Sequence, residues 1–438
     1  MPVPKHHTTA PFSRKIFIRF RLLFRRYPLV PYLLRWVLIC LILGLLIGSA
    51  AAFFLQTLQW ATTFREEHHW ILFLLPAGGF LVGWLYNRYG KSVASGNNLL
   101  IDTILEPGKT IPFKMAPMVY AGTIITHLLG GSAGREGTAL QMAGAIADQL
   151  HKPFKLSKED RSTLLIAAVA AGFGAVFGTP LAGTLFGIEF FLLGRLRYQA
   201  LFPAMMAAVL ADLVTRAWGI PHTHYPMGIT PSLSFDKLTF VLIAGILFGW
   251  CAALFSKAMD YCSTSFRKYI AYPPFRPVAG GLLILLFVWC SGTTKYIGLG
   301  IPAIVSAFDT TALPYDFALK MLLTVITLSA GFKGGEVTPL FFIGATLGSA
   351  LSLMIPLPHA LLAGMGFVAV FAGATNTPLA CTVMGIELFG MECGVYIALA
   401  CVVAYLCSGN NSIYSSQQID TPKHRRFGHL RGKRIQDL

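Results

Sequence analysis

The sequence predicts an all-α polytopic membrane protein made of two inverted repeats of tilted and broken transmembrane helices. Three observations support this fold class: the apolar composition, the recurrence of long apolar runs, and an internal duplication. Of the 438 residues, 55% are hydrophobic and only 12% are charged, with a mean hydropathy of +0.63. A soluble protein with a large core is the alternative, and such a core has no place for this much apolar sequence.

Apolar runs long enough to cross a bilayer recur along the chain. The clearest are residues 33–55, 70–86, 240–255 and 360–374. A helical span needs roughly 20 apolar residues, and irregular or shorter pieces are tolerated where protein buries them. The sequence therefore predicts a bundle of helices of unequal length in a lipid bilayer.

Two sequence blocks occur twice in the same order. "AGREGTALQMAGA" at 133–145 resembles "KGGEVTPLFFIGA" at 333–345, so that Glu136 coincides with Glu336. A second pair, "TPLAGTLFGIE" and "TPLACTVMGIE", follows the first pair with nearly the same separation along the chain. Two matched pairs at a nearly constant separation indicate a duplicated unit.

The domain bounds follow from this duplication. Residues 33–416 are expected to form the transmembrane domain, with repeats at about 33–218 and 238–416. The polar segment 219–237, rich in Pro and Thr, is the expected linker. Repeats in membrane transporters place a binding site at the interface between them, and repeats with an odd number of crossings insert in opposite senses.

Basic residues gather at both ends of the chain, whose net charge is +16. Residues 1–32 are the basic N-terminal segment and residues 417–438 the basic C-terminal tail. Basic flanks stay on the cytoplasmic side, so we expect both termini in the cytoplasm and an even number of crossings. Nucleic-acid binding is the alternative, but the tails lack regular aromatic interleaving, so we favour lipid contact. The first apolar run starts too late and is too long for a cleavable signal peptide.

Motifs of enzymes and metal sites are absent from the sequence. The eight cysteines mostly lie in apolar segments and form no CxxC pair, so we interpret them as packing residues. No HExxH, GxSxG or P-loop occurs, so we expect no enzyme, no cofactor and no metal. An intramembrane hydrolase using Glu136 and Glu336 is a remote alternative, since no nucleophile or histidine accompanies the pair.

Glycines flank Glu136 and break or start a helix where the chain is otherwise apolar. A helix that starts inside the membrane leaves free N–H groups, and these groups with the helix dipole favour an anion. Such irregular backbone is tolerated only where it is buried in protein or lines a cavity. Four glycine-rich helix starts are expected, around residues 96, 134, 334 and 410. They predict a buried anion pathway.

Glu136 has a role in such a pathway. Its carboxylate can occupy the anion site as a tethered anion, and a protonated carboxyl no longer competes and can leave, which couples anion movement to a proton. A buried salt bridge with the adjacent Arg135 is the alternative. Arg135 is otherwise expected to support the loop or the electric field of the pathway.

Other polar residues are interpreted as structural. Glu189 and Glu387 occupy equivalent repeat positions at helix ends, where we expect carboxylates bonded to nearby backbone or lying at the interface. His222 and His224 have a metal-like spacing but lie in the linker without further ligands. For His127, packing is favoured over a proton relay.

Four motifs together carry a family resemblance: "GREGT" followed by a glutamine, "GGEVTP", the paired "TPLA…GIE" blocks, and "SIYSSQ" near the C-terminus. With them the chain resembles the CLC family of chloride channels and proton-coupled anion exchangers, and more closely its fluoride-exporting branch. The resemblance covers about residues 30–416. It implies a homodimer with one pathway per subunit, in a bacterial inner membrane.

The resemblance also implies roles for individual residues. Glu136 matches the gating glutamate, Glu336 a second glutamate found in the fluoride branch, and Tyr414 the central tyrosine. Asn97 stands where chloride-handling members have the serine of a Gly-Ser-Gly-Ile-Pro segment. The implied anion-binding set is Asn97, Gly134, Arg135, Gly137, Val337, Thr338 and Tyr414.

The chain departs from chloride exchangers at two places that the fluoride branch shares. Thr138 replaces the typical proline, and Phe190 aligns with the internal proton-transfer glutamate. The Asn97 amide and the ring edges of Phe341 and Phe342 suit a small, hard anion. We therefore expect a fluoride/proton antiporter that exports fluoride. A chloride/proton exchanger or passive chloride channel is the alternative, since the residues alone indicate only an anion.

Overall fold

The computed structural model describes residues 29–108 and 110–438, so the expected basic segment at 1–32 lies mostly outside the described residues. Helices of the first half are α2 (Leu29–Glu67), α3 (Leu75–Tyr89), α4 (Asn97–Leu105), α5 (Met115–Leu128), α6 (Glu136–Asp148), α7 (Lys158–Phe177), α8 (Pro180–Glu189) and α9 (Leu201–Ala217). Helices of the second half are α10 (Phe235–Tyr269), α11 (Phe275–Ser291), α12 (Ile301–Asp309), α13 (Asp316–Ser329), α14 (Val337–Leu351), α15 (His359–Thr375), α16 (Pro378–Phe389) and α17 (Gly394–Cys407).

Short elements connect and follow these helices. The 3-10 helices are η1 (His69–Leu74), η2 (Lys91–Val93), η3 (Gln149–His151), η4 (Tyr198–Ala200), η5 (Met391–Cys393), η6 (Arg425–Leu430) and η7 (Ile435–Asp437). The strands β1 (Leu192–Leu193) and β2 (Gln418–Ile419) form one parallel pair. The predicted helical membrane fold is confirmed, apart from this minimal sheet.

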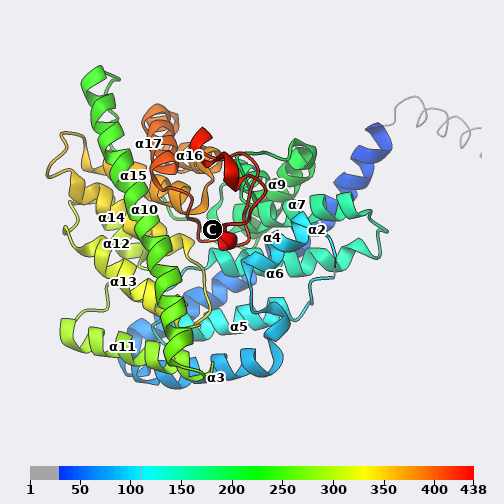
Figure 1. Ribbon diagram of the computed structural model, residues 1–438, viewed down its shortest axis with the longest axis horizontal. Coiled ribbons are helices and arrows are strands. Elements are labelled where there is room, and N and C mark those ends of the chain that lie inside the picture. Colours follow the sequence, from blue (N-terminus) through cyan, green and yellow to red (C-terminus); the bar gives the residue numbers. More distant parts are fainter. Residues whose placement is uncertain (1–28, 109) are drawn as a thin grey trace, which may run out of the picture.

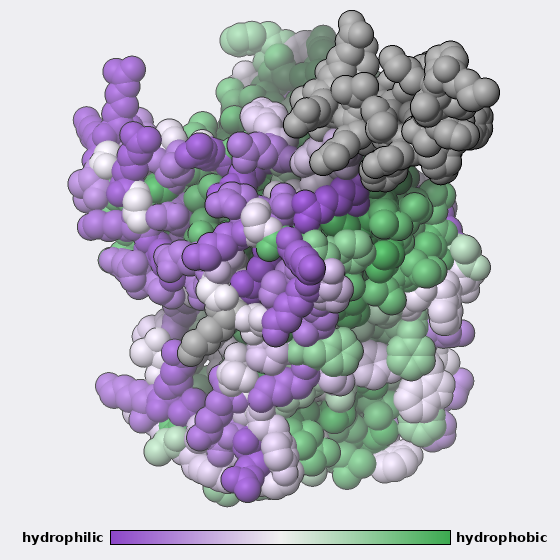
Figure 2. All heavy atoms as spheres, turned by 90° about the vertical axis from the view of Figure 1, so that its right-hand side faces the viewer, coloured by the Kyte–Doolittle hydropathy of each residue, from purple (hydrophilic) through white to green (hydrophobic). Residues whose placement is uncertain are grey.

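The helices differ in length as the apolar runs predict. Five helices of the described part are long and apolar enough to cross a membrane, and the longest is α2 with 39 residues. By contrast, α4 has only 9 residues, which at 1.5 Å per residue is about 14 Å, half the thickness of a hydrocarbon core. Figure 2 shows apolar side chains gathered over one broad area of the surface and polar side chains over another.

The duplicated blocks occupy equivalent helices. The first block begins α6 and α14, the second begins α8 and α16, and the helices between them, α7 and α15, are almost completely buried. α15 packs against α14 and α17, while α7 packs against α8 and α9 (Figure 1). The apolar core thus surrounds one helix from each half, and the short helices start beside it.

Glu189 and Glu387 tie the two halves together reciprocally. At the end of α8, the Glu189 carboxylate accepts hydrogen bonds from two N–H groups in the first turn of α16 (N–O 3.2 and 2.8 Å). At the end of α16, the Glu387 carboxylate accepts two bonds from the first turn of α8 (3.0 and 2.7 Å). Both residues are backbone-bonded structural carboxylates, as the sequence predicts. Each satisfies N–H groups that a helix start leaves free.

The expected helix start near residue 410 is wrong. Three of the four glycine-rich starts precede helices, namely α4, α6 and α14, but residues 410–417 form turns and no helix. The reason is local hydrogen bonding: the Ser412 hydroxyl accepts a bond from the Tyr414 N–H, and the Gln417 amide donates to two main-chain carbonyls. Side-chain bonds of this kind compete with a helical backbone.

Candidate anion site between two helix starts

The starts of α6 and α14 are joined back to back. The Gly134 N–H donates to the Gly335 carbonyl (2.6 Å) and the Gly335 N–H to the Gly134 carbonyl (2.8 Å), which forms an isolated antiparallel bridge. A Cβ at Gly134 would lie 2.9 Å from the Gly335 oxygen, and one at Gly335 would lie 2.7 Å from the Gly137 nitrogen. Only glycines permit this approach, which brings one helix N-terminus from each repeat to the same place.

The Glu136 carboxylate lies on the N-terminus of α14, the helix of the other repeat. It is buried, with 1% exposure. Its Oε2 accepts from the Thr338 N–H and the Arg135 N–H, both at 3.1 Å, and its Oε1 accepts from the Thr338 hydroxyl. The sequence predicts a carboxylate held by helix-start N–H groups; in the structure one of the two N–H groups, together with the hydroxyl, comes from the other repeat.

Arg135 combines the two roles considered for it. Its Nε lies 3.6 Å from Glu136 Oε1, so an ion pair exists, although the distance is too long for a hydrogen bond. The side chain is 20% exposed and lines a cavity of about 570 Å³, which we call the basic cavity. Its charged and titratable lining residues are Arg65, Glu66, His69, Arg135, His222 and Lys295. Three of these are Arg or Lys and one is an acid, so the lining is predominantly basic and favours anions, although Lys295 is also paired with Asp316 (2.7 Å).

A small cavity of about 20 Å³ lies against Glu136 and shares Arg135 with the basic cavity. Its lining includes Thr338 and the rings of Phe341 and Phe367, which stack with centroids 4.0 Å apart. Phe342 instead lies under Lys320, with the ammonium 5.2 Å from the ring centroid. Of the two rings suggested by the sequence, Phe341 is therefore the one beside the carboxylate.

A third cavity, of about 160 Å³, carries the amide and hydroxyl groups, and we call it the amide cavity. Its polar lining is Ser95, Asn97, Asn98, Gln141, Lys333, Glu336 and Tyr414. Within the described residues, three buried atoms here have no hydrogen-bond partner: Asn97 Oδ1, Glu336 Oε2 and the Tyr414 hydroxyl. Buried polar atoms are normally satisfied, so three such atoms in one cavity indicate a place that binds water or an ion.

Gly137 connects this cavity to the helix starts. A Cβ on it would lie 3.1 Å from both Asn97 Nδ2 and Gly335 Cα, and 3.7 Å from Glu336 Oε2. The first turn of α6 thus lies close to Asn97 and to the second glutamate. Glu136 and Glu336 line different cavities, with the glycine bridge close to both.

The residues predicted to bind the anion differ in whether their hydrogen-bond donors are already used within the protein. The Gly134 N–H is used in the bridge, so this amide is not open to an anion. The N–H and hydroxyl of Thr338 are used by Glu136, and an anion reaches them only if that carboxylate leaves. Val337 is the first, buried residue of α14. Phe190 is also buried, with its ring 5.9 Å from that of Tyr414.

Several residues that line the cavities are not among the site residues that the sequence predicts. Gln141 on α6 and Lys333 both belong to the duplicated blocks, at 133–145 and 333–345, so the blocks could have indicated them. Arg65 and Lys295 belong to the basic cavity but carry no motif. Only their charge in an apolar chain marks them.

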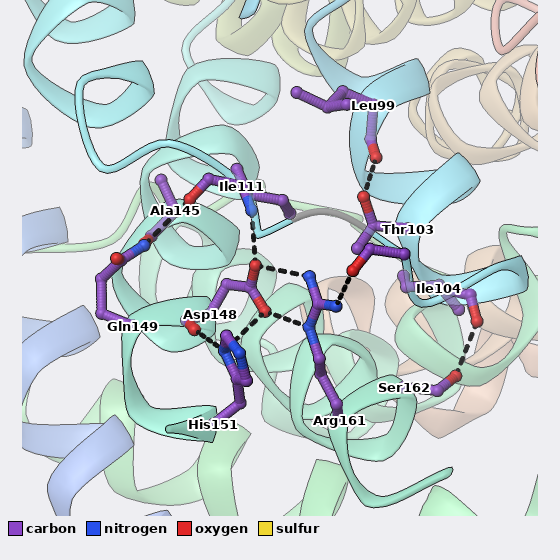
Figure 3. Close-up of polar contacts among 11 residues, drawn as sticks. Leu99, Thr103, Ile104, Ile111, Ala145, Asp148, Gln149, His151, Arg161 and Ser162 are labelled. Atoms are coloured by element: carbon purple, nitrogen blue, oxygen red, sulfur yellow. Dashed lines mark hydrogen bonds and ion pairs between the residues drawn. The ribbon is translucent and has the colours of Figure 1, made fainter. Parts of the chain in front are cut away.

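The far end of α6 is fixed by a buried ion pair (Figure 3). The Asp148 carboxylate accepts from Arg161 Nε (2.7 Å) and Nη2 (2.8 Å), and from the Ile111 N–H (2.6 Å). Arg161 Nη1 donates to the Gly108 carbonyl (3.0 Å). Because Gly108 and Ile111 follow α4, this cluster holds the ends of α4, α6 and the start of α7 together.

The chain is similar in sequence to known membrane proteins. A family model described as voltage gated chloride channel matches residues 78–409. A chloride/fluoride channel protein of Pseudomonas syringae pv. tomato is 51% identical over 404 residues, which are 91% of this chain and 89% of that protein.

Two solved structures are also similar. One is a CLC-type fluoride/proton antiporter, with a TM-score of 0.85 and 35% identity over 88% of this chain and 98% of that one. The other is a slow cyanobacterial Cl⁻/H⁺ antiporter, with a TM-score of 0.74 and 21% identity over 85% and 94% of the two chains. The second likeness bears on the fold alone.

Proposed function

The chain belongs to the voltage gated chloride channel family, and from this premise we propose that it is a fluoride/proton antiporter that exports fluoride from the cytoplasm. The observation that carries the proposal is the buried Glu136 carboxylate on the start of α14. An acidic side chain held there by anion-binding groups is a protein-bound substitute for the transported anion.

Exchange follows from competition for these donors. A fluoride ion arriving at the N–H and hydroxyl of Thr338 requires Glu136 to leave. Protonation removes the charge of the carboxyl and turns one oxygen into a donor, so the N–H groups become available to the anion. When the proton is released, the carboxylate returns and closes the path. One residue thereby binds anion donors and a proton in alternation, and Glu336 supplies a second carboxyl beside the amide cavity.

Fluoride is favoured over chloride by the donors present. It is small and strongly hydrated, so its site has to replace water with good hydrogen-bond donors. Asn97 supplies an amide N–H₂ group, and Phe341 supplies a ring with a positive edge. The names of the similar proteins, a chloride/fluoride channel and a fluoride/proton antiporter, support the same choice. A chloride/proton exchanger or a passive chloride channel is the second candidate, supported by the family description.

The proposal includes the orientation of the protein in the membrane. We infer a homodimer in a bacterial inner membrane, with both termini in the cytoplasm, from the family resemblance and the basic flanks. The amide cavity, which adjoins the C-terminal segment, then opens toward the cytoplasm. The basic cavity contains Arg65 from the last turn of α2, the end opposite the N-terminus, and opens to the outside. A reporter active only outside the cell, fused at Leu438, should stay silent; activity there contradicts this orientation.

Selectivity in reconstituted vesicles tests the function. Vesicles loaded with potassium fluoride or potassium chloride are diluted into anion-free buffer, and efflux is followed with ion-selective electrodes under an imposed pH gradient. We expect fluoride efflux to exceed chloride efflux strongly. Asn97→Ser, which installs the side chain of chloride-handling members, should lower this preference, whereas Asn87→Ser on α3 should leave it unchanged. Chloride efflux as fast as fluoride efflux rejects the fluoride assignment.

A further inference from the structure

The chain after Tyr414 folds back onto the protein, and we call residues 415–438 the C-terminal strap. Its first anchor is Gln417, which is fully buried. The Gln417 Nε2 donates to the carbonyls of Phe190 (2.9 Å) and Thr375 (3.0 Å), and its Oε1 accepts from Asn376 Nδ2 (2.9 Å). These partners belong to both repeats, so the strap starts at a fixed place, three residues beyond Tyr414.

The end of the strap returns to its beginning. The Ile435 N–H donates to the Gln417 carbonyl (3.0 Å) and the Gln436 N–H to the Ser415 carbonyl (2.8 Å). Beneath this doubled segment, a small apolar cluster buries Leu193, Ile419 and Leu430, with Ile435 packed against it. The strap is therefore a folded part of the protein, and not only a charged tail.

One side chain of the strap forms ion pairs at the C-terminal end of α4. The Arg434 guanidinium forms ion pairs with Asp102 (Nη1–Oδ1 3.0 Å) and Glu106 (Nη2–Oε1 3.0 Å). Asp102 lies in the last turn of α4, and Glu106 is the residue directly after this helix, so the guanidinium binds the C-terminal end of α4. A third bond runs from the Ser416 N–H to Asn98 Oδ1 (3.1 Å), at the other end of α4. Figure 1 shows the strap, in red, next to α4.

The position of α4 depends on such ties. A helix of 9 residues is too short to be stable alone, so tertiary contacts decide where it lies. On one side it is held by the Arg161 cluster, through the Gly108 carbonyl and the bond from the Ser162 hydroxyl to the Ile104 carbonyl (Figure 3). On the other side it is held by the strap. α4 begins with Asn97, whose side chain shares the amide cavity with Tyr414.

We propose that Arg434 is a positioning residue for transport: by holding α4 against the strap, it fixes Asn97 opposite Tyr414 in the amide cavity. This inference rests on the proposed function for its transport readout. Neighbouring basic residues differ from Arg434, whose side chain is only 25% exposed. Arg431 and Lys433 are exposed and show no ion pair within the described residues. They provide matched controls of the same charge on the same segment.

The test compares Arg434→Gln with Arg431→Gln in the full-length protein. In vesicles, Arg434→Gln should raise the fluoride concentration for half-maximal efflux about fivefold, because two partly exposed ion pairs contribute about 1 kcal/mol together. The fluoride-to-chloride ratio should fall in parallel. Arg434→Lys, which retains the charge but not the two-pronged geometry, should recover part of the loss, and Arg431→Gln should equal the wild type.

Hydrogen exchange of the purified protein provides a readout that does not depend on transport. Arg434→Gln should speed exchange of the backbone amides of α4 while exchange in α7 and α15 stays at the wild-type rate; Arg431→Gln should change neither. Unchanged α4 exchange, unchanged fluoride dependence, or faster exchange throughout the protein each overturns the inference. If the wild type itself shows no fluoride preference, the proposed function fails, and the exchange data still decide whether Arg434 holds α4.

Discussion

Replacement of Glu136 by glutamine tests the tethered-carboxylate reasoning most directly. The carboxylate is held by two N–H groups at 3.1 Å, from Arg135 and Thr338, and by the Thr338 hydroxyl. Glutamine keeps the shape and one acceptor oxygen. The N–H bonds therefore persist as neutral ones, and the new NH₂ group can donate to the hydroxyl, which changes from donor to acceptor.

The expected weakening follows from these bonds. A hydrogen bond to a charged group contributes about 1.5–3 kcal/mol, and a neutral one about 0.5–1.5 kcal/mol. Two N–H bonds each lose about 1 kcal/mol, so the side chain leaves this position between the two helix starts roughly 30-fold more readily. Because the glutamine side chain cannot take up and release a proton, Glu136→Gln should abolish proton-driven fluoride transport and leave a passive fluoride flux.

The assay records fluoride and proton movement together in vesicles under an imposed pH gradient. The control is Glu67→Gln, because this glutamate is exposed at the end of α2 and lies outside the linings of the three cavities. We expect wild-type coupling in the control. Proton-driven fluoride accumulation at the wild-type level in Glu136→Gln refutes the gate assignment. If Glu136→Gln passes no fluoride at all, the expected weakening of its hydrogen bonds to the helix starts is wrong.

Four further substitutions and one control have distinct expected outcomes. Glu336→Gln should change anion preference or uncouple protons in the same vesicles without unfolding the protein; unchanged selectivity and coupling would make this residue structural. Glu189→Gln leaves one N–H group at the start of α16 facing an NH₂ group, which should cost about 1–3 kcal/mol of unfolding free energy and lower Tm. Glu387→Gln should lower Tm less, because the Glu387 carboxylate is less buried. A Tm decrease for Glu387→Gln that equals or exceeds the decrease for Glu189→Gln contradicts this prediction. Asp148→Asn leaves the buried Arg161 without its counter-charge and should cost about 3–5 kcal/mol in thermal unfolding, against about 1 kcal/mol or less for Glu159→Gln at the exposed start of α7.

The fold and the central glutamate could be predicted because their signals are local or repeated. The glycines around Glu136 and Glu336 are typical of helix starts, and the duplicated blocks indicate that both starts belong to one site. The equivalent positions of Glu189 and Glu387 at helix ends follow from the same duplication, whereas their bonding to the other repeat does not. Hydropathy gave the long spans without reference to tertiary contacts.

The remaining features depend on which segments meet in space. The Thr338 donors to Glu136 come from the other repeat, and no pattern near Glu136 indicates them. Gly409 and its neighbours resemble a helix start, but the side-chain bonds of Gln417 hold that segment in turns. The basic C-terminal tail suggests lipid contact by its charge, whereas Arg434 in the structure pairs with two acids at the C-terminal end of α4. Charge composition alone does not distinguish these partners.

The exchange of carboxylates between α8 and α16 has a consequence for biosynthesis. As the chain emerges from the ribosome, the first half is complete while the acceptor for the start of α8, Glu387, has not yet been made. Until the second half arrives, these N–H groups require water or another temporary partner, since lipid offers none. Insertion of α16 then satisfies the starts of α8 and α16 in a single step, because it brings Glu387 to α8 and its own N–H groups to Glu189.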